Sequence, residues 1–269
     1  MNHDALIEVT RLSKVFCPLQ LRLRSLRPLR RQPPVCALQD VSLTVRRGEI
    51  VGLVGTNGAG KTTLLKILGT LILPTTGRAL VHGCDVARDD DRIKQYIGLM
   101  SSDERSFYWR LTGQQNLEFF AAFQGYSVHA ARARIAQLRS QLGLDALERR
   151  YGLYSTGMKH RLSLARALLH DPDILLLDEP TRSLDPLAAV NLRRLLREQL
   201  VALQGRTVLI ATHNLHEAEE LCDRIAILHQ GRLAGCGTLD ELRRQSGDHA
   251  MTLSEVFERL AVSEKPGHQ

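Results

Sequence analysis

Long apolar runs are missing from this sequence of 269 residues. No stretch reaches the roughly 18 consecutive apolar residues that a membrane-spanning helix needs. The first ten residues, MNHDALIEVT, also lack the basic and apolar regions of a secretory signal peptide. We therefore expect the chain to stay in the cytosol unless a partner holds it at a membrane.

Cysteines are few and have no recognisable spacing. The sequence contains five of them, without a CxxC pair and without the histidine-rich spacing of zinc sites. They are Cys17, Cys36, Cys84, Cys222 and Cys236. We expect reduced thiols rather than disulfides or zinc ligands.

The net charge of +7 comes mainly from one short stretch. Pro18–Pro34 holds five arginines and no acid, and subtracting those five charges from +7 leaves +2 for the rest of the chain. A solvated surface loop is the favoured interpretation of this Arg-rich insertion, at about 18–35. A contact with anionic lipid headgroups or with an acidic partner is the alternative. Since the remaining charge is ordinary, we expect no nucleic-acid partner.

Short apolar runs alternate with helical patterns along the chain. Ile50–Val54 is continuously apolar, which is typical of a strand covered on both faces. Other strands are expected at 6–12, 38–45, 78–82, 96–100, 173–178 and 207–212. Helices are expected at 61–71, throughout 113–170, after Asp185 and from Thr238 onward. Asp185 can cap its helix with Pro186 in the first turn, and Thr252 with Glu255 makes a capping box. This order predicts an α/β fold with a largely parallel sheet, an antiparallel N-terminal β portion and an inserted helical subdomain.

A glycine-rich loop follows the apolar strand and opens a helix, which is the required context for a P-loop. Its glycines let successive N–H groups point at phosphate oxygens, and the helix dipole adds to the attraction. Lys61 can reach the β- and γ-phosphates, and the Thr62 hydroxyl can bind Mg²⁺. We predict a P-loop NTPase core whose nucleotide-binding residues are Gly55, Thr56, Asn57, Gly58, Ala59, Gly60, Lys61, Thr62 and Thr63.

Two adjacent acids end the apolar strand at 173–178. Unpaired buried charge is costly, so acids at the tip of a core strand usually meet a cation or a water held for chemistry. We expect the strand that ends in Asp178 to lie beside the P-loop strand, where Asp178 can hold Mg²⁺. Glu179 can then act as the base that polarises the attacking water.

With both elements in place, nearly the whole chain resembles the nucleotide-binding subunit of an ATP-binding cassette (ABC) transporter. Tyr154–Met158 stands where that family has its Leu-Ser-Gly-Gly-Gln signature, and Ser183–Asp185 matches the D-loop. The resemblance implies that His213 is the switch histidine, which orients water and Glu179. It further implies that Phe16 stacks on the adenine of ATP.

The signature turn provides a second anion site, because Ser155 and Gly157 present a hydroxyl and N–H groups at a helix N-terminus. In the family each signature completes the ATP site of the other subunit. The resemblance therefore implies a head-to-tail, two-fold symmetric pair, either a homodimer or a pair of ABC subunits. It also places Asp185, in the D-loop, among the nucleotide-binding residues.

Three positions depart from the family pattern. Ser102 stands where a glutamine that touches Mg²⁺ is usual, so an adjacent carboxylate substitutes or metal coordination is weaker here. The signature has Thr156 for a glycine and Met158 for a glutamine, changes that keep its turn and hydroxyl.

The aromatic cluster Phe107-Tyr108-Trp109 falls where the family docks the coupling helix of its permease, with core packing as the alternative.

The resemblance implies an ATPase that powers a separate membrane permease from the cytoplasmic face of the membrane. The family domain would span 1–237, with its helical subdomain at about 105–170, and 238–269 would form a C-terminal helical extension. That ending resembles the subunits of ABC-2 type exporters. Two alternatives stay open: a soluble ABC ATPase that acts on nucleic acid or ribosomes, and a regulatory nucleotide-binding module with weak hydrolysis. The sequence does not reveal the cargo, since in this family its recognition lies mainly in the permease.

Overall fold

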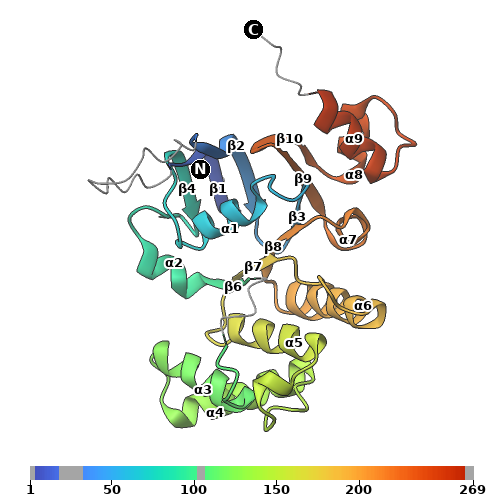
Figure 1. Cartoon of the computed structure of the whole chain (residues 1–269). Helices are drawn as coiled ribbons and strands as arrows, with labels where there is room; N and C mark the ends of the chain where they lie inside the picture. The colour runs from blue at the N-terminus through green and yellow to red at the C-terminus, as the bar shows by residue number, and fades with distance from the viewer. Residues whose placement is uncertain (1–3, 18–32, 102–106, 264–269) are drawn as a thin grey trace, which may run out of the picture.

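Two sheets and a helical layer make up the computed structural model (Figure 1), which describes residues 4–17, 33–101 and 107–263. Most of the Arg-rich insertion and Ser102 lie outside the described residues. In the described ranges, no helix is long and apolar enough to cross a bilayer. All five cysteines are free thiols.

The larger sheet has six strands in the order β10-β9-β3-β8-β7-β6. All neighbouring pairs are parallel except β9 and β10, which are antiparallel. Every residue of β3, β7 and β8 is buried, as expected of strands covered on both faces. The strands are β3 (Ile50–Val54), β6 (Ile97–Met100), β7 (Ile174–Asp178), β8 (Thr207–Thr212), β9 (Arg224–His229) and β10 (Arg232–Gly237).

The strand order corrects one expectation. The strand that ends in Asp178 is not beside the P-loop strand, because β8 lies between β7 and β3. Two strand spacings, about 10 Å, therefore separate β3 from β7. The order of strands along the chain cannot reveal that β8 lies between β3 and β7, because the crossover connections decide which strands become neighbours in the sheet. As a consequence, His213 follows a strand that pairs with both β3 and β7.

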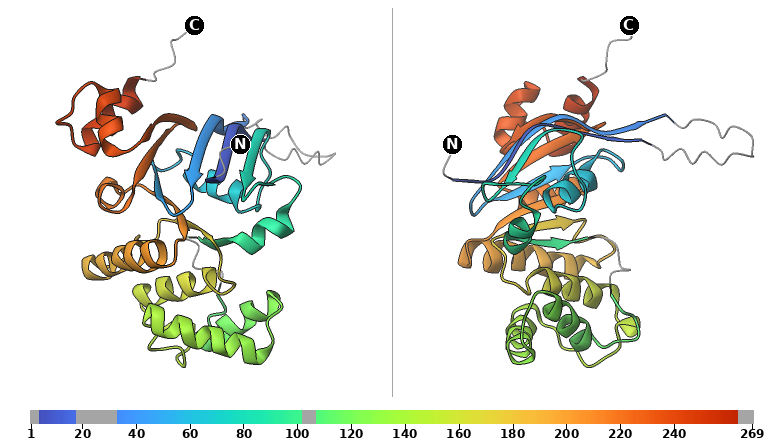
Figure 2. Two further views of the ribbon diagram at one scale, coloured as in Figure 1. Left: turned by 180° about the vertical axis from the view of Figure 1, so that it is seen from behind. Right: turned by 90° about the vertical axis from the view of Figure 1, so that its left-hand side faces the viewer.

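The smaller sheet is antiparallel, as expected for the N-terminal portion. Its order is β2-β1-β4-β5, and β1 and β2 extend together past the rest of the molecule (Figure 2). Helix α1 (Lys61–Leu68) contacts strands of both sheets, and its apolar residues join the core between them. It ends at Leu68, with Gly69 as its C-cap, earlier than expected. The strands are β1 (Ala5–Phe16), β2 (Val35–Arg46), β4 (Thr76–Val81) and β5 (Cys84–Asp85).

The helical layer lies below β6 and β7 in Figure 1. The region expected to be helical throughout is broken, because residues 124–127 and 143–150 are not helical. Its apolar stripes pack into one core with the lower face of the large sheet. Phe107 is buried and stacks on Tyr151, whereas the side chains of Tyr108 and Trp109 are exposed. The elements are α3 (Gly113–Phe123), α4 (Val128–Leu142), η2 (Tyr151–Leu153) and α5 (Thr156–Ala167).

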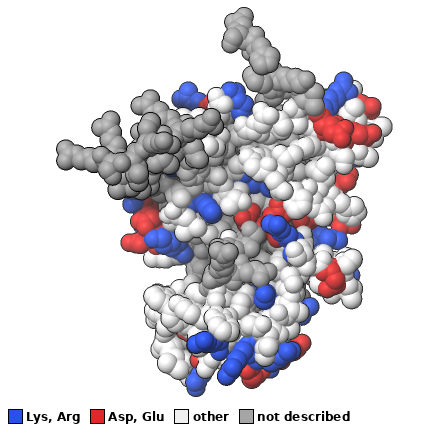
Figure 3. Space-filling view, viewed as in Figure 1, with Lys and Arg blue, Asp and Glu red and all other residues white. Residues whose placement is uncertain are grey.

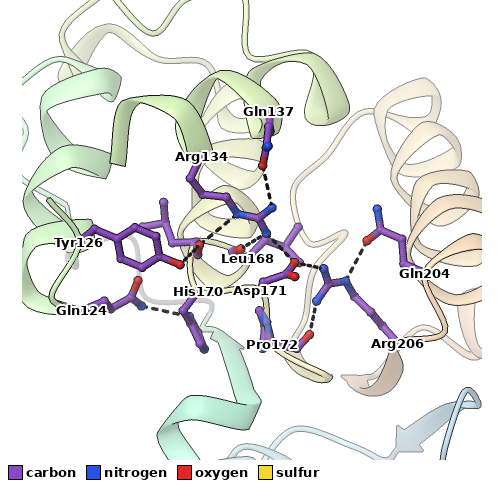
Figure 4. Close-up of polar contacts among 11 residues, drawn as sticks. Gln124, Tyr126, Arg134, Gln137, Leu168, His170, Asp171, Pro172, Gln204 and Arg206 are labelled. Atoms are coloured by element: carbon purple, nitrogen blue, oxygen red, sulfur yellow. Dashed lines mark hydrogen bonds and ion pairs between the residues drawn. The ribbon is translucent and has the colours of Figure 1, made fainter. Parts of the chain in front are cut away.

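A polar junction fastens this layer to the sheet (Figure 4). Arg134 of α4 donates to the carbonyls of Leu168 and Leu169 after α5. Its Nη2 also lies 2.8 Å from Oδ1 of Asp171, which Nη2 of Arg206 approaches to 2.5 Å from the other side. One carboxylate thus joins the helical layer to the loop that enters β8.

The last two helices, at Leu239–Ser246 and Leu253–Ser263, contact β10 at the other end of the large sheet. Asp185 caps α6 by accepting a hydrogen bond from Ala188 N, with Pro186 in the first turn, as the sequence predicts. The expected capping box of Thr252 and Glu255 is also formed. The helices are α2 (Asp90–Tyr96), α6 (Pro186–Arg194), the π-helix η3 (Leu195–Leu203), α7 (Leu215–Leu221), α8 (Leu239–Ser246) and α9 (Leu253–Ser263).

Candidate functional site

The loop between β3 and α1 has a backbone that only glycine accepts without strain. Gly58 and Gly60 have φ values of 82° and 106°, in the left-handed region. A Cβ on Gly55 would collide with the carbonyl oxygen of Leu228, and one on Gly60 with that of Ala37. Conformation and close packing therefore both require the glycines that the sequence shows here. Asn57 and Thr56 are exposed along the loop, Ala59 is buried, and Thr63 is half-buried in the first turn of α1.

Lys61, the first residue of α1, is buried against this loop, with 6% of its side chain exposed. Its Nζ donates to the carbonyls of Gly55, at 2.7 Å, and of Thr56, at 3.2 Å. It also lies 3.8 Å from Oε1 of Glu179. Burial lowers the pKa of Lys61, while the nearby carboxylates of Glu179 and Asp178 raise it. The ammonium is thus held inside the loop that would cradle phosphate groups.

The Thr62 hydroxyl points at the end of β7. Its Oγ1 lies 3.1 Å and 3.0 Å from the two carboxylate oxygens of Asp178, a residue with 4% exposure. A hydroxyl beside a carboxylate is a set of hard oxygen donors, which suits Mg²⁺. The contact spans the width of β8 and joins two residues that are 116 positions apart in the chain.

Glu179 has an unusual backbone. Its φ of 52° lies in the left-handed region, and its N–H donates to the carbonyl of Ala211 in β8 at 2.8 Å. Such strain in a residue other than glycine persists only where its surroundings enforce it, and it concentrates at functional sites. The carboxyl lies between Lys61 and His213, whose Nδ1 is 2.7 Å from Oε2.

Five of the residues singled out from the sequence therefore meet at one place. Lys61, Thr62, Asp178, Glu179 and His213 form a contact network at the carboxyl ends of β3, β7 and β8. Parallel sheets bind ligands at this edge. A loop that can hold phosphates, a pair of oxygen donors for a cation and a carboxylate beside an imidazole can together hydrolyse a nucleoside triphosphate.

The remaining predicted residues lie outside that network within the described part of the chain. Ser155 caps α5 by accepting a hydrogen bond from Met158 N at 3.3 Å. A Cβ on Gly157 would lie 3.9 Å from Leu184, so the signature turn borders the segment that ends in Asp185. Phe16 ends β1 with 42% exposure, and Nζ of Lys14 lies 5.0 Å from the centre of its ring.

Three residues near the network were not predicted from the sequence. Glu217 of α7 is buried, and one of its carboxylate oxygens accepts a hydrogen bond from Thr212, the residue before His213. Burial raises the pKa of Glu217, and the side chain of Thr181, two residues after Glu179, lowers it. The only trace in the sequence is an acid in the first turn of a short helix, which is an ordinary pattern at helix starts.

Comparison with known proteins agrees with this geometry. A model of the ABC transporter family matches residues 38–182. The ABC transporter ATP-binding protein NatA of Bacillus subtilis is 40% identical over 209 residues, which cover 77% of this chain and 84% of NatA. The doxorubicin resistance ATP-binding protein DrrA of Mycobacterium tuberculosis is 39% identical over 228 residues, which cover 84% of this chain and 66% of DrrA. The probable multidrug protein YbhF of Escherichia coli is longer, and the match covers 39% of it.

Solved structures share the fold over most of this chain. The structure of an ATP-binding subunit of an ABC transporter superposes with a TM-score of 0.77 at 31% identity, over 95% of this chain and 99% of that one. The post-hydrolysis dimer of the cassette MJ0796, bound to ADP and Pi, superposes with a TM-score of 0.75 at 26% identity, over 87% and 98% of the two chains. Sequence and structure agree: this chain belongs to the ABC transporter family, as an ATP-binding subunit that hydrolyses ATP.

Proposed function

We propose that this chain is the motor of an exporter and that the five-residue network at the ends of β3, β7 and β8 hydrolyses its ATP. Lys61 and the backbone N–H groups of the P-loop hold the phosphates. Glu179 accepts the proton of a water whose oxygen attacks the γ-phosphorus, and the bond from that phosphorus to the β-γ bridging oxygen breaks. His213 orients Glu179 and the water. The contact between His213 and Glu179 is the observation that carries this assignment.

Thr62 and Asp178 would hold Mg²⁺ through their oxygen atoms. When bound, the ion neutralises charge on the phosphate oxygens. The side chains already face each other, so the donors need little rearrangement to accept a cation. We assign no role in holding Mg²⁺ to Ser102.

We further propose that two subunits enclose ATP head to tail. The support is that Ser155 and Gly157 form an N-terminal helix turn suited to an anion, yet lie outside the network of their own chain. In this arrangement the turn would bind the γ-phosphate held by the partner subunit, and Asp185 would lie at the interface. Phe16 would stack on the adenine.

A permease partner is supported by exposed aromatics. Tyr108 and Trp109 are 50% and 64% exposed, although Phe107 beside them is buried in the core. Aromatic side chains are enriched at protein interfaces. We propose that these two receive a permease segment, which would hold the chain at the cytoplasmic face of the membrane. Export, rather than import, is supported by the relatives named for drug resistance and multidrug transport.

The nucleic-acid alternative finds no support on the face of the molecule drawn in Figure 3. On the face drawn in Figure 3, basic and acidic side chains are interspersed over the sheets and the helical layer. A nucleic-acid groove would instead gather lysines and arginines into a continuous stripe. A regulatory module is disfavoured because Lys61, Asp178, Glu179 and His213 all occupy the network.

The test is steady-state ATP hydrolysis by the purified chain, beside Glu179→Gln and the exposed control Glu258→Gln. We expect Glu179→Gln to lose hydrolysis by about a hundredfold or more. We also expect it to elute as a dimer on size exclusion in ATP, whereas the control behaves as wild type. Undiminished hydrolysis in Glu179→Gln would refute the assignment of the base. ATP binding without turnover in the wild type would favour the regulatory module.

A further inference from the structure

Glu217 is a buried acid that the proposed chemistry does not use. It lies in the first turn of α7, and 1% of its surface is exposed. Oε2 accepts a hydrogen bond of 2.8 Å from the Thr212 hydroxyl, and Oε1 is buried without a hydrogen bond among the described residues. Burial raises the pKa of this carboxyl. The Thr212 and Thr181 side chains and Arg193 lower the pKa, but they offset the effect of burial only in part. An acid kept in so unfavourable a place calls for an explanation.

The Glu217 carboxyl hydrogen-bonds to the segment that carries His213, and the side chain of Thr181, on the segment that carries Glu179, lowers its pKa. Thr212 directly precedes His213, and its Oγ1 also accepts the N–H of Asn214 at 3.0 Å. The hydroxyl therefore fixes the backbone on both sides of His213. Thr181 lies on the other segment, two residues beyond Glu179, and its carbonyl accepts the N–H of Leu184 at 3.1 Å. The turn that leads to Asp185 begins at this point.

Helix formation does not explain the acid. Asn214 already caps α7, since its Oδ1 accepts the N–H of Glu217 at 3.2 Å. The carboxyl accepts a hydrogen bond from the Thr212 hydroxyl, which in turn accepts the N–H of Asn214. Arg193 of α6 pairs with Glu220 at 2.9 Å, so its main partner is a different acid. Glu179 is the other charged group close enough to affect Glu217, and it repels the carboxylate form.

We propose that Glu217 is a positioning residue that clasps the ends of β7 and β8, so that His213 and Glu179 stay aligned and move together with the Ser183–Asp185 turn. The inference rests on the proposed roles of His213 and Glu179. A contact of His213 with the γ-phosphate would be transmitted through Thr212, Glu217 and Thr181 to the turn that faces the partner subunit. The clasp acts on the reacting groups rather than on ATP binding, because the P-loop holds the nucleotide independently.

Hydrogen exchange tests the clasp in the nucleotide-free chain. The variants are Glu217→Ala, Glu217→Gln and the control Glu219→Ala, which changes an exposed acid of the same helix. The N–H groups of Arg182, Leu184 and Asn214 are hydrogen-bonded within the two segments and serve as reporters. We expect Glu217→Ala to speed exchange in both segments, and Glu217→Gln, which keeps the shape and an acceptor for Thr212, to restore it. Faster exchange in one segment alone, or in neither, would overturn the proposal.

Steady-state kinetics on the same variants tests the consequence. Misplacing catalytic groups slightly can cost about a hundredfold in rate, so we expect Glu217→Ala to lower kcat by about tenfold to a hundredfold. We expect KM for ATP to change by less than about threefold, because interactions made only in the transition state affect kcat. Glu217→Gln should recover most of the rate. Equal changes in kcat and KM, or no recovery in Glu217→Gln, would indicate a merely structural acid and refute the positioning role.

Failure of the proposed function gives a different result. If the wild type does not hydrolyse ATP, or if Glu179→Gln hydrolyses it normally, the catalytic assignment fails while the exchange data still decide whether Glu217 clasps the two strand ends. If wild type and Glu179→Gln behave as expected and Glu217→Ala resembles Glu219→Ala, only the clasp fails.

Discussion

Nδ1 of His213 lies 2.7 Å from Oε2 of Glu179, across the ends of the neighbouring strands β8 and β7. The two residues are 34 positions apart in the chain and are brought together by the pairing of Asp178 with Ala211. The imidazole is 51% exposed, whereas the carboxyl is 11% exposed. The pair thus has one member facing solvent and one facing Lys61, which is the arrangement expected of a site that admits ATP and water.

This pairing predicts strong non-additivity between the two residues. We expect His213→Ala to lower kcat by about a hundredfold, and the double variant with Glu179→Gln to lose little beyond Glu179→Gln alone, because residues that act as a unit cannot be lost twice. His216→Ala, in the first turn of the next helix, is the matched control. Multiplicative losses in steady-state kcat would show that the two side chains act independently.

Asp178 should govern the requirement for Mg²⁺. We expect Asp178→Asn to raise the Mg²⁺ concentration that gives half-maximal hydrolysis by roughly tenfold to a hundredfold, since one of the two oxygen-donor side chains loses its charge. Asp173→Asn, at the exposed entrance to β7, should not. Removal of the metal with EDTA should stop hydrolysis, and added Mg²⁺ should restore it. Hydrolysis that continues in EDTA would contradict the assignment of Thr62 and Asp178.

The polar junction in Figure 4 should make stability depend on acid pH. Burial raises the pKa of Asp171, but hydrogen bonds and charges from Arg206 and Arg134 outweigh burial and bring this pKa below its ordinary value. The carboxylate therefore contributes stability above about pH 4, and this contribution is lost as pH falls through the folded-state pKa.

We expect Asp171→Asn to lower the free energy of unfolding at pH 7 by about 1–2 kcal/mol, less than a buried pair would give, because Asp171 is 65% exposed and screened by water. Denaturant titrations at pH 7, 5 and 3.5 should show the difference from wild type shrinking at the lowest pH. Asp91→Asn, with a side chain that is 94% exposed, is the control. A difference that does not change with pH would mean that the charge is unimportant.

Gly55 should tolerate no side chain. A Cβ there would collide with the backbone of β9 at Leu228, so we expect Gly55→Ala to lower the free energy of unfolding by about 3 kcal/mol. Gly58 has open space around it and only a left-handed backbone, so Gly58→Ala should cost about 1 kcal/mol. Thermal unfolding without nucleotide separates stability from binding. Equal losses would show that β9 yields to the added carbon.

Local features of this protein could be read from the sequence because neighbouring residues determine them. The glycines of the P-loop, the Asp185 cap with Pro186 and the buried strand Ile50–Val54 depend on backbone conformation and solvation within a few residues. The antiparallel pair β9 and β10 was not predicted, although each of its strands is short and local, because its pattern is too weak without the sheet beside it.

Placement of those elements was decided by tertiary structure. The sequence predicted which residues would meet phosphate and metal, yet it placed β7 beside β3, where the fold inserts β8 and thereby brings His213 into the network. The contacts of Glu217 with Thr212 and of Asp171 with two arginines of different elements also left no trace in the sequence. Strand order and such bridges depend on which surfaces pack together after the chain has crossed over, and hydrogen bonds formed across that packing have no periodicity along the chain.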